Sequence, residues 1–247
     1  MTALTALART QSKVFLREPL AVFFGLVFPS VLLVVIGFAF PDATEPAEVF
    51  GGRSLVEVYA PTAIVLGLAT VAVFLLPVAL GGDREKGILR RLSATPAHPR
   101  TLVAAHLVVQ LVVVTLATIA AVLVGMLVFD IALPESLGWF AASFVLGALS
   151  LLAVGLLIGA LVPTANSGQA LGMLLYFPLL FFAGVYIPLQ VMPEGVQTIS
   201  LYTPAGAAVQ ALSDSWIGVV PETSSLLVMV AYVVVAGSLA VWFFRWE

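Results

Sequence analysis

A charged segment separates two long apolar runs about a third of the way along the chain, and it reads Gly81-Gly82-Asp83-Arg84-Glu85-Lys86-Gly87-Ile88-Leu89-Arg90-Arg91-Leu92-Ser93-Ala94-Thr95-Pro96. The run before it covers residues 58–80 and the run after it covers residues 101–129. Each run is long enough to cross the hydrocarbon core of a bilayer. Because basic residues stay on the cytoplasmic side of a membrane, the charged segment is expected inside the cell.

Working outward from this segment, the sequence predicts six transmembrane helices, at about residues 20–40, 58–80, 101–129, 139–162, 169–189 and 223–244. Of the 247 residues, 62% are apolar and 9% are charged, so no separate water-soluble domain fits beside six spans. The Lys and Arg residues alternate with the runs as the positive-inside rule requires, with Arg53 as the exception. We therefore expect one all-α transmembrane domain over residues 1–247, with both termini in the cytoplasm.

Residues 1–19 are predicted to form an amphipathic helix that lies in the membrane interface. Apolar residues share one face and cations recur every four residues on the other, as Arg9, Lys13 and Arg17. Such a helix places its cations near anionic lipid headgroups. A frayed cytoplasmic tail is the alternative interpretation.

The interior of the six runs contains no Asp, Glu, Lys or Arg, which disfavours an ion-coupled carrier or channel. His106 and Gln110, one helical turn apart near the inner end of the third run, are the nearest candidates for a proton path. An interhelical hydrogen bond or a headgroup contact is the favoured interpretation of this pair. Cysteine is absent and no His-Glu-x-x-His motif occurs, so neither a catalytic site nor a metal site is predicted.

Small residues recur at helical spacing in two places. Gly155 and Gly159 lie in the fourth run, and Gly168 and Gly172 open the fifth. This spacing lets helix backbones approach closely in lipid. Packing within one subunit is favoured slightly over a seam between two subunits.

The charged segment itself is predicted to form a short helix over residues 83–96. Asp83 is an acceptable N-cap, and Pro96 disfavours helix at the residue before it. An apolar stripe of Ile88, Leu89 and Leu92 lies among the charges, as in a helix that docks in a groove of another protein. An amphipathic loop anchored at lipid headgroups fits the same residues.

The segment resembles a motif of type-2 ABC export permeases, E-[RK]-G-T-L-x-x-L-x-x-[TS]-P, with Ile88 where Thr is usual. Residues 177–193 resemble the same family's F-x-S-G-x-x-x-P-x-x-x-[ML]-P stretch, and residues 203–212 resemble its N-P continuation, with Thr203 where Asn is common. The resemblance covers the whole chain in order. Within the family, the chain is most similar to compact bacterial drug-resistance permeases related to daunorubicin exporters.

This resemblance implies that residues 83–96 are a coupling helix seated on a separate ATP-binding subunit. The ATPase-coupling residues would be Arg84, Glu85, Lys86, Gly87, Ile88, Leu89, Arg90, Arg91, Leu92, Thr95 and Pro96. ATP and Mg would be bound by that partner, because neither lysine of this chain follows glycine as a phosphate-binding loop requires. Two ATPase subunits and a second permease, identical or related, would complete the assembly in the bacterial inner membrane. No cofactor or nucleic-acid partner is expected for this chain, and no enzymatic activity of its own.

Residues 190–222 are too apolar for a free loop and too interrupted by proline for a span. In the resembled family this region forms short re-entrant helices in the outer leaflet, which suggests a lid over the translocation path. The residues of this outer gate would be Gly184, Pro188, Pro193 and Pro204. An interfacial hairpin anchored by Tyr202 and Trp216 is the alternative.

The aromatic residues of the first, second and fifth spans are candidates for a path taken by a lipophilic drug-like or lipid cargo. They are Phe23, Phe24, Phe28, Phe74, Phe177, Phe181 and Phe182. Aromatic side chains that simply face lipid are the more common explanation. The alternative functions are a polysaccharide, glycolipid or haem-related exporter of the same family, and an ion-coupled carrier or channel.

Overall fold

The computed structural model describes residues 3–88, 91 and 99–244. This part of the chain is helical, with one isolated bridge between Ala47 and Arg53, so the prediction of an all-α protein is confirmed. The helices are α1 (Ala3–Arg17), α2 (Pro19–Val22), η1 (Phe23–Val27), α3 (Phe28–Ala39), η2 (Glu48–Phe50), α4 (Leu55–Ala69), η3 (Thr70–Leu75), α5 (Leu76–Glu85), α7 (Pro99–Phe129), α8 (Leu137–Leu161), α9 (Ala165–Phe182), η4 (Leu189–Val191), α10 (Glu194–Leu201), α11 (Pro204–Trp216) and α12 (Thr223–Phe243).

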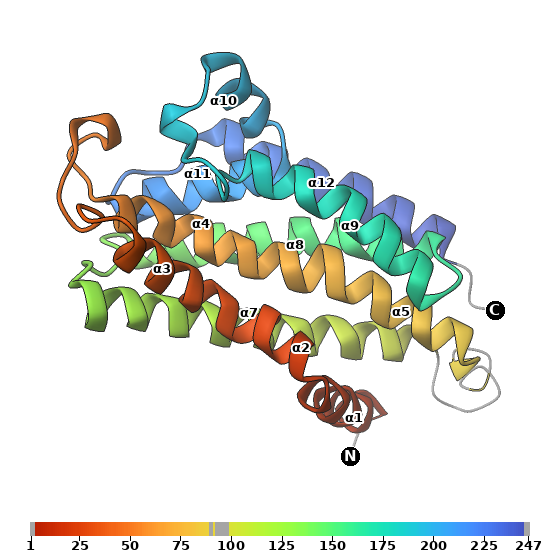
Figure 1. The fold of residues 1–247 in the computed structure, drawn as a ribbon. Coiled ribbons are helices and arrows are strands. Elements are labelled where there is room, and N and C mark those ends of the chain that lie inside the picture. Colours follow the sequence, from red (N-terminus) through yellow and green to blue (C-terminus); the bar gives the residue numbers. More distant parts are fainter. Residues whose placement is uncertain (1–2, 89–90, 92–98, 245–247) are drawn as a thin grey trace.

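Five helical stretches among the described residues are long and apolar enough to cross a membrane. They are Pro19–Ala39, Leu55–Glu85, Arg100–Phe129, Leu137–Leu161 and Thr223–Phe243. They run roughly along one common axis and form a bundle (Figure 1). Each corresponds to one of the runs predicted from the sequence, so the chain is a multi-pass membrane protein.

The predicted fifth span corresponds to α9, which is not one of those five and is shorter than expected. The helix ends in a Schellman motif, in which Gly184 has φ 78° and donates its N–H to the Phe181 carbonyl. The N–H of Val185 donates to the Leu180 carbonyl in the same motif. The predicted end at residue 189 is therefore wrong, because apolar residues continue beyond the glycine that stops the helix.

Two membrane helices contain a π-helical segment just before a proline. The segment η1 precedes Pro29, and η3 precedes Pro77. Proline has no N–H for the carbonyl four residues earlier, and its ring collides with that carbonyl, so a local widening of the helix accommodates it. At the start of η3, the Thr70 hydroxyl donates to the Leu66 carbonyl at 2.7 Å and lies 2.8 Å from the hydroxyl of Tyr176 in α9.

The paired glycines bring α8 and α9 against the second span. A Cβ on Gly155 would lie 1.7 Å from the Ala72 carbonyl oxygen, and one on Gly168 would lie 2.6 Å from the Pro77 carbonyl oxygen. Gly172 approaches the Val73 carbonyl in the same way, and Gly159 packs against the Leu80 side chain. All four glycines therefore serve close packing within this chain, as the favoured interpretation predicts.

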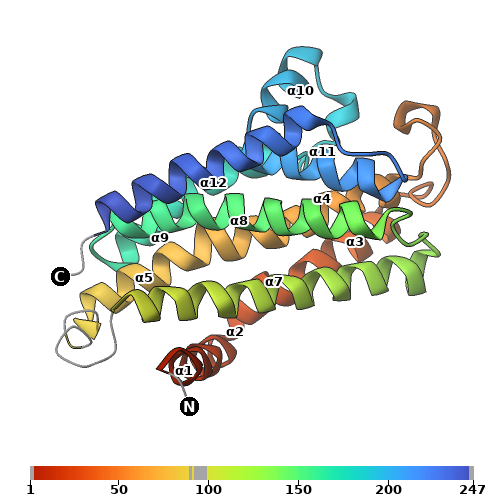
Figure 2. The same ribbon diagram turned by 180° about the vertical axis from the view of Figure 1, so that it is seen from behind.

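The bundle has two distinct ends. At one end, α1 packs against α7 and turns away from the bundle axis, and α5 and α12 have their C-termini at this same end (Figures 1 and 2). At the other end lie α10 and α11, and α11 is buried against α8, α12 and α4. Trp216 is 8% exposed and donates its Nε1–H to the Ala132 carbonyl at 3.0 Å, so it packs inside the bundle rather than anchoring a hairpin at an interface.

Candidate functional site

The charged segment begins as a continuation of the second span. Residues 83–85 form the last turn of α5, so the expectation that Asp83 caps a new helix is wrong. The helix stops at Lys86, and Gly87 follows with φ 65°. A new helical turn then starts, because the Arg91 N–H donates to the Gly87 carbonyl. Of the predicted coupling residues, Leu89, Arg90, Leu92, Thr95 and Pro96 lie outside the described part of the chain.

Arg84 points back into the bundle. Its guanidinium donates to the carbonyl of Gly159 at 3.0 Å and also to the carbonyl of Val162, at the C-terminal end of α8. The same group lies 5.4 Å from the ring centroid of Phe244. A cation at the last carbonyls of a helix is favourable, and the contact fixes the end of α5 to the end of α8.

Glu85 is exposed but also has a partner within the chain. Its carboxylate accepts the backbone N–H of Ala165 at 3.1 Å, at the first turn of α9. The same turn is closed by a capping box between Thr164 and Ser167. A carboxylate at a helix N-terminus is favourable, so Glu85 joins the end of α5 to the start of α9.

Asp83 forms the third connection of this turn. Its Oδ2 lies 2.8 Å from Nε2 of His106 on α7, and both side chains are largely buried. The interhelical hydrogen bond favoured for His106 is therefore confirmed. Gln110 is 7% exposed, and its Oε1 has no hydrogen-bond partner among the described residues.

The exposed cations of the described segment come after these three contacting residues in the sequence. The side chains of Lys86 and Arg91 are exposed, and the Arg91 guanidinium donates to the Lys86 carbonyl at 2.7 Å. Ile88 is half-buried and packs against the hydrophobic core. The segment therefore carries exposed cations on a base that α7, α8 and α9 hold in place.

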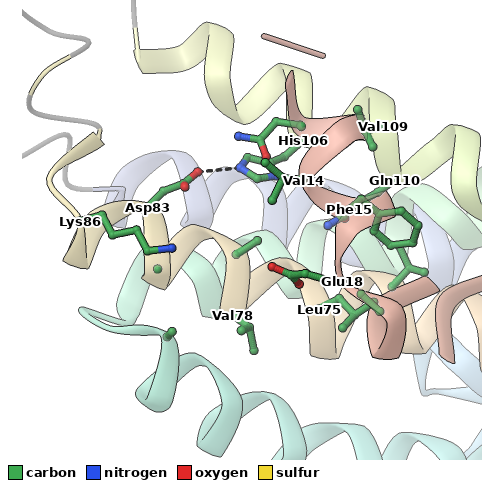
Figure 3. Close-up of a pocket in the computed structure, with 16 residues that line it drawn as sticks. Val14, Phe15, Glu18, Leu75, Val78, Asp83, Lys86, His106, Val109 and Gln110 are labelled. Carbon is green, nitrogen blue, oxygen red and sulfur yellow. Dashed lines mark hydrogen bonds and ion pairs between the residues drawn. The ribbon is translucent and has the colours of Figure 1, made fainter. Parts of the chain in front are cut away.

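A pocket of about 210 Å³ lies beside this segment, where α1, α5 and α7 meet. Figure 3 shows Glu18, Lys86, Asp83, His106 and Gln110 around it, with apolar residues between them. Glu18 occupies the corner between α1 and α2, a position that the sequence analysis did not single out. Its signal in the sequence is an acidic residue between the cationic helix and the first apolar run.

The predicted aromatic path residues form two groups. Phe23, Phe24 and Phe28 contact one another on the first span, with ring centroids 5.2 to 6.1 Å apart. On the second span and α9, Phe74 and Phe177 each lie within 6 Å of the Tyr176 ring. The second group also takes in Phe181 and Phe182, which form an edge-to-face pair on α9.

The two aromatic groups lie on the same face of the bundle. Phe28 and Tyr176 pack against one small buried cluster, made of Leu66, Ala69 and Leu180. Figure 1 shows α3 and α9 on either side of the second span. The structure thus brings the faces of the first span, the second span and α9 together.

The predicted outer-gate residues each begin or end an element. Gly184 ends α9, Pro188 and Pro193 precede η4 and α10, and Pro204 starts α11. The Ser200 hydroxyl donates to the Phe182 carbonyl, which joins α10 to the end of α9. The region is therefore a compact set of short helices joined to α9.

Comparison with known proteins gives two findings. The sequence model of a family described as "ABC-2 type transporter" matches residues 2–217. The chain is also similar to a Bacillus subtilis (strain 168) protein named "Putative transport permease YvfS", with 26% identity over 162 residues. That alignment covers 65% of this chain and 66% of the relative.

Proposed function

Because the chain belongs to the ABC-2 type transporter family, we propose that it is the membrane-spanning permease subunit of an ATP-driven exporter in the bacterial inner membrane. A separate subunit, present in two copies, binds ATP and Mg and hydrolyses the ATP. A second permease, identical or related, completes the unit. The cargo is a lipophilic drug-like molecule or a lipid, carried out of the cytoplasm.

One observation carries this proposal: three consecutive residues connect the base of the charged segment to three other helices. Asp83 contacts α7, Arg84 contacts α8 and Glu85 contacts α9. A force applied by an ATPase at Lys86 and beyond would therefore reach all three helices at once. A loop that only anchors at headgroups has no need of such a rigid base.

The topology follows from the same assignment. With the charged segment in the cytoplasm, the alternation of cations puts α1 and both termini on that side. The helix α9 then acts as the fifth of six spans, supported by its close contact with the second span at Gly168 and Gly172. The short helices α10 and α11 lie at the outer end, where they cover the exit of the path.

The cargo path lies on the face formed by the first span, the second span and α9. Phe23 and Phe24 are each 40% exposed there, and Phe177 is 54% exposed. A second permease placed against this face would enclose the aromatic side chains in a shared apolar path. Exposed aromatic surface without hydrogen-bonding groups suits a lipophilic cargo better than a carbohydrate.

The test is ATP hydrolysis by the reconstituted permease and its ATP-binding subunit, with the double variant Lys86→Ala/Arg91→Ala. Both side chains are exposed, so their removal leaves the contacts of Asp83, Arg84 and Glu85 in place. We expect the affinity of the two subunits to fall about tenfold or more, with a loss of permease-dependent hydrolysis. Arg53→Ala, which removes a cation at the opposite end, is the matched control and should have no effect. Unchanged assembly and turnover in the double variant would contradict the proposal.

A further inference from the structure

A groove of about 460 Å³ lies between α8, α9 and α12. It exists because α9 packs mainly on α5 and η3 of the second span, whereas α12 packs mainly on α8. Val154 and Leu157 line the groove from α8, and Leu175 and Leu179 line it from α9. Its volume falls within the roughly 300–1,000 Å³ typical of binding sites for small molecules.

The chemistry of the groove suits a hydrocarbon. Among the described residues that line it, Tyr232 has the single polar side chain. The Tyr232 hydroxyl donates to the carbonyl of Tyr202 at 3.3 Å, so its proton is already used. No lining side chain is then left to donate a hydrogen bond to a sugar, a phosphate or another polar group.

The groove is separate from the aromatic face proposed for the cargo. With about 3.6 residues per turn, Leu175 and Leu179 share one side of α9, and Phe177 and Phe181 lie roughly on the opposite side. Tyr176 lies between these two sides and contacts Thr70 of the second span. What fills the groove is therefore next to α9 but outside the proposed path.

The position of the groove indicates what is available to fill it. Both α8 and α12 are long and apolar enough to cross a membrane. Val235 on α12 is 58% exposed and Leu175 on α9 is 44% exposed, so the groove opens between these helices toward the bilayer. An empty groove at this depth would deprive its lining atoms of packing contacts, and the surrounding medium is hydrocarbon.

We propose that this groove binds one acyl chain of a membrane phospholipid, with the lipid head at the end of the bundle that carries α10 and α11. Tyr202 lies at that end of the groove and is 67% exposed, and tyrosine favours the level of the lipid headgroups. The bound chain packs against Leu175 and Leu179 and supports α9 on the side that the second span leaves uncovered. The proposal rests on the membrane-spanning helices alone and not on the proposed transport.

Photocrosslinking tests the proposal on the purified full-length chain in vesicles of phosphatidylcholine that carries a diazirine in one acyl chain. We expect the groove residues Val154 and Leu157 to be labelled severalfold more than Val241, an exposed residue of α12 outside the groove. Equal labelling of the groove and of Val241 would mean that only the ordinary lipid boundary is present, and it would overturn the proposal.

A matched pair of variants fills the groove or leaves it open. Ala231→Trp adds an indole at an exposed lining position of α12, and Val234→Trp adds one at an exposed position of the same helix outside the groove. Labelling of Val154 and Leu157 should fall to the level of Val241 in Ala231→Trp and stay at the wild-type level in Val234→Trp. Full labelling of both residues in Ala231→Trp would contradict the proposal.

A further measurement asks whether a second copy of the chain occupies the groove instead. The chain has no cysteine, so Val235→Cys places a single thiol at the edge of the groove. Under oxidising conditions in the same vesicles, we expect this variant to remain free of disulfide-linked dimers. Efficient dimer formation through Val235→Cys would place a second chain there and overturn the proposal.

Discussion

The guanidinium of Arg84 donates to the carbonyl of Gly159 at 3.0 Å, which ties the end of the second span to the end of the fourth. Its two neighbours make similar ties, Asp83 to His106 and Glu85 to the backbone of Ala165. The exposed cations begin only after this turn, at Lys86. The charged segment is thus a surface feature on a base built from contacts within the chain.

Replacing Arg84 tests the contact with α8. Arg84→Ala should lower the free energy of unfolding by about 1.5–3 kcal/mol, because it removes hydrogen bonds from a charged donor. The stability of Arg84→Lys should lie between that of Arg84→Ala and that of wild type, because lysine keeps the charge but lacks the planar guanidinium fork. Thermal unfolding of the detergent-purified wild type and of both variants measures these differences in stability. An unchanged midpoint for Arg84→Ala would show that the contact contributes nothing to stability.

The Asp83–His106 pair can be examined by a double-mutant cycle. His106→Leu should destabilise the protein by about 1.5–3 kcal/mol, because Asp83 is left without its partner in a largely buried position. Adding Asp83→Leu should restore part of that loss, and the difference gives the coupling energy. Strictly additive effects of the two changes would argue against a direct interaction.

The close contact between α8 and the second span predicts a strong effect at Gly155. A Cβ there would lie 1.7 Å from the Ala72 carbonyl oxygen, so Gly155→Ala must push the helices apart. Such overpacking costs roughly 1–3 kcal/mol. Gly237→Ala in α12 is the matched control, because a Cβ at that position meets no atom within 4 Å. If Gly155→Ala and Gly237→Ala have the same free energy of unfolding, the close approach of α8 to the second span does not constrain packing.

The end of α9 predicts a conformational requirement at Gly184. With φ 78°, this position costs an L-residue roughly 1–2 kcal/mol, and a Cβ would also lie 3.0 Å from the Leu189 side chain. Gly184→Ala should therefore destabilise the protein, and Gly184→Asn should do so less, since Asn tolerates this region better. Gly195→Ala in α10, where a Cβ has open space, provides the comparison. A fully stable Gly184→Ala protein would contradict the Schellman geometry.

Much of the fold could be predicted from the sequence, because apolar runs and cations obey the constraints of the bilayer. The paired glycines and the interhelical role of His106 were also readable, since small residues and lone polar groups have few uses inside a membrane. The boundaries of α9 were harder to predict from the sequence. Hydropathy continues past Gly184, and only the backbone conformation at that glycine shows where the helix ends.

The sequence predicts where the candidate site lies along the chain, but not the contacts that its side chains make. Asp83 has the chemistry of an N-cap, but an apolar run that continues into charged residues can also continue as one helix, and here it does. The inward direction of Arg84 depends on carbonyls contributed by α8, which lie far away in the sequence. The pocket depends on how α1 packs beside α7, and no local pattern encodes that contact.

The most direct test of the central claim is where the ATP-binding subunit touches this chain. Because the chain has no cysteine, Lys86→Cys gives a single thiol at the proposed dock, and Gly52→Cys gives one at the opposite end. We predict that a short bifunctional crosslinker joins Lys86→Cys to the ATP-binding subunit and leaves Gly52→Cys unlinked. Crosslinking from Gly52→Cys with none from Lys86→Cys would contradict the account.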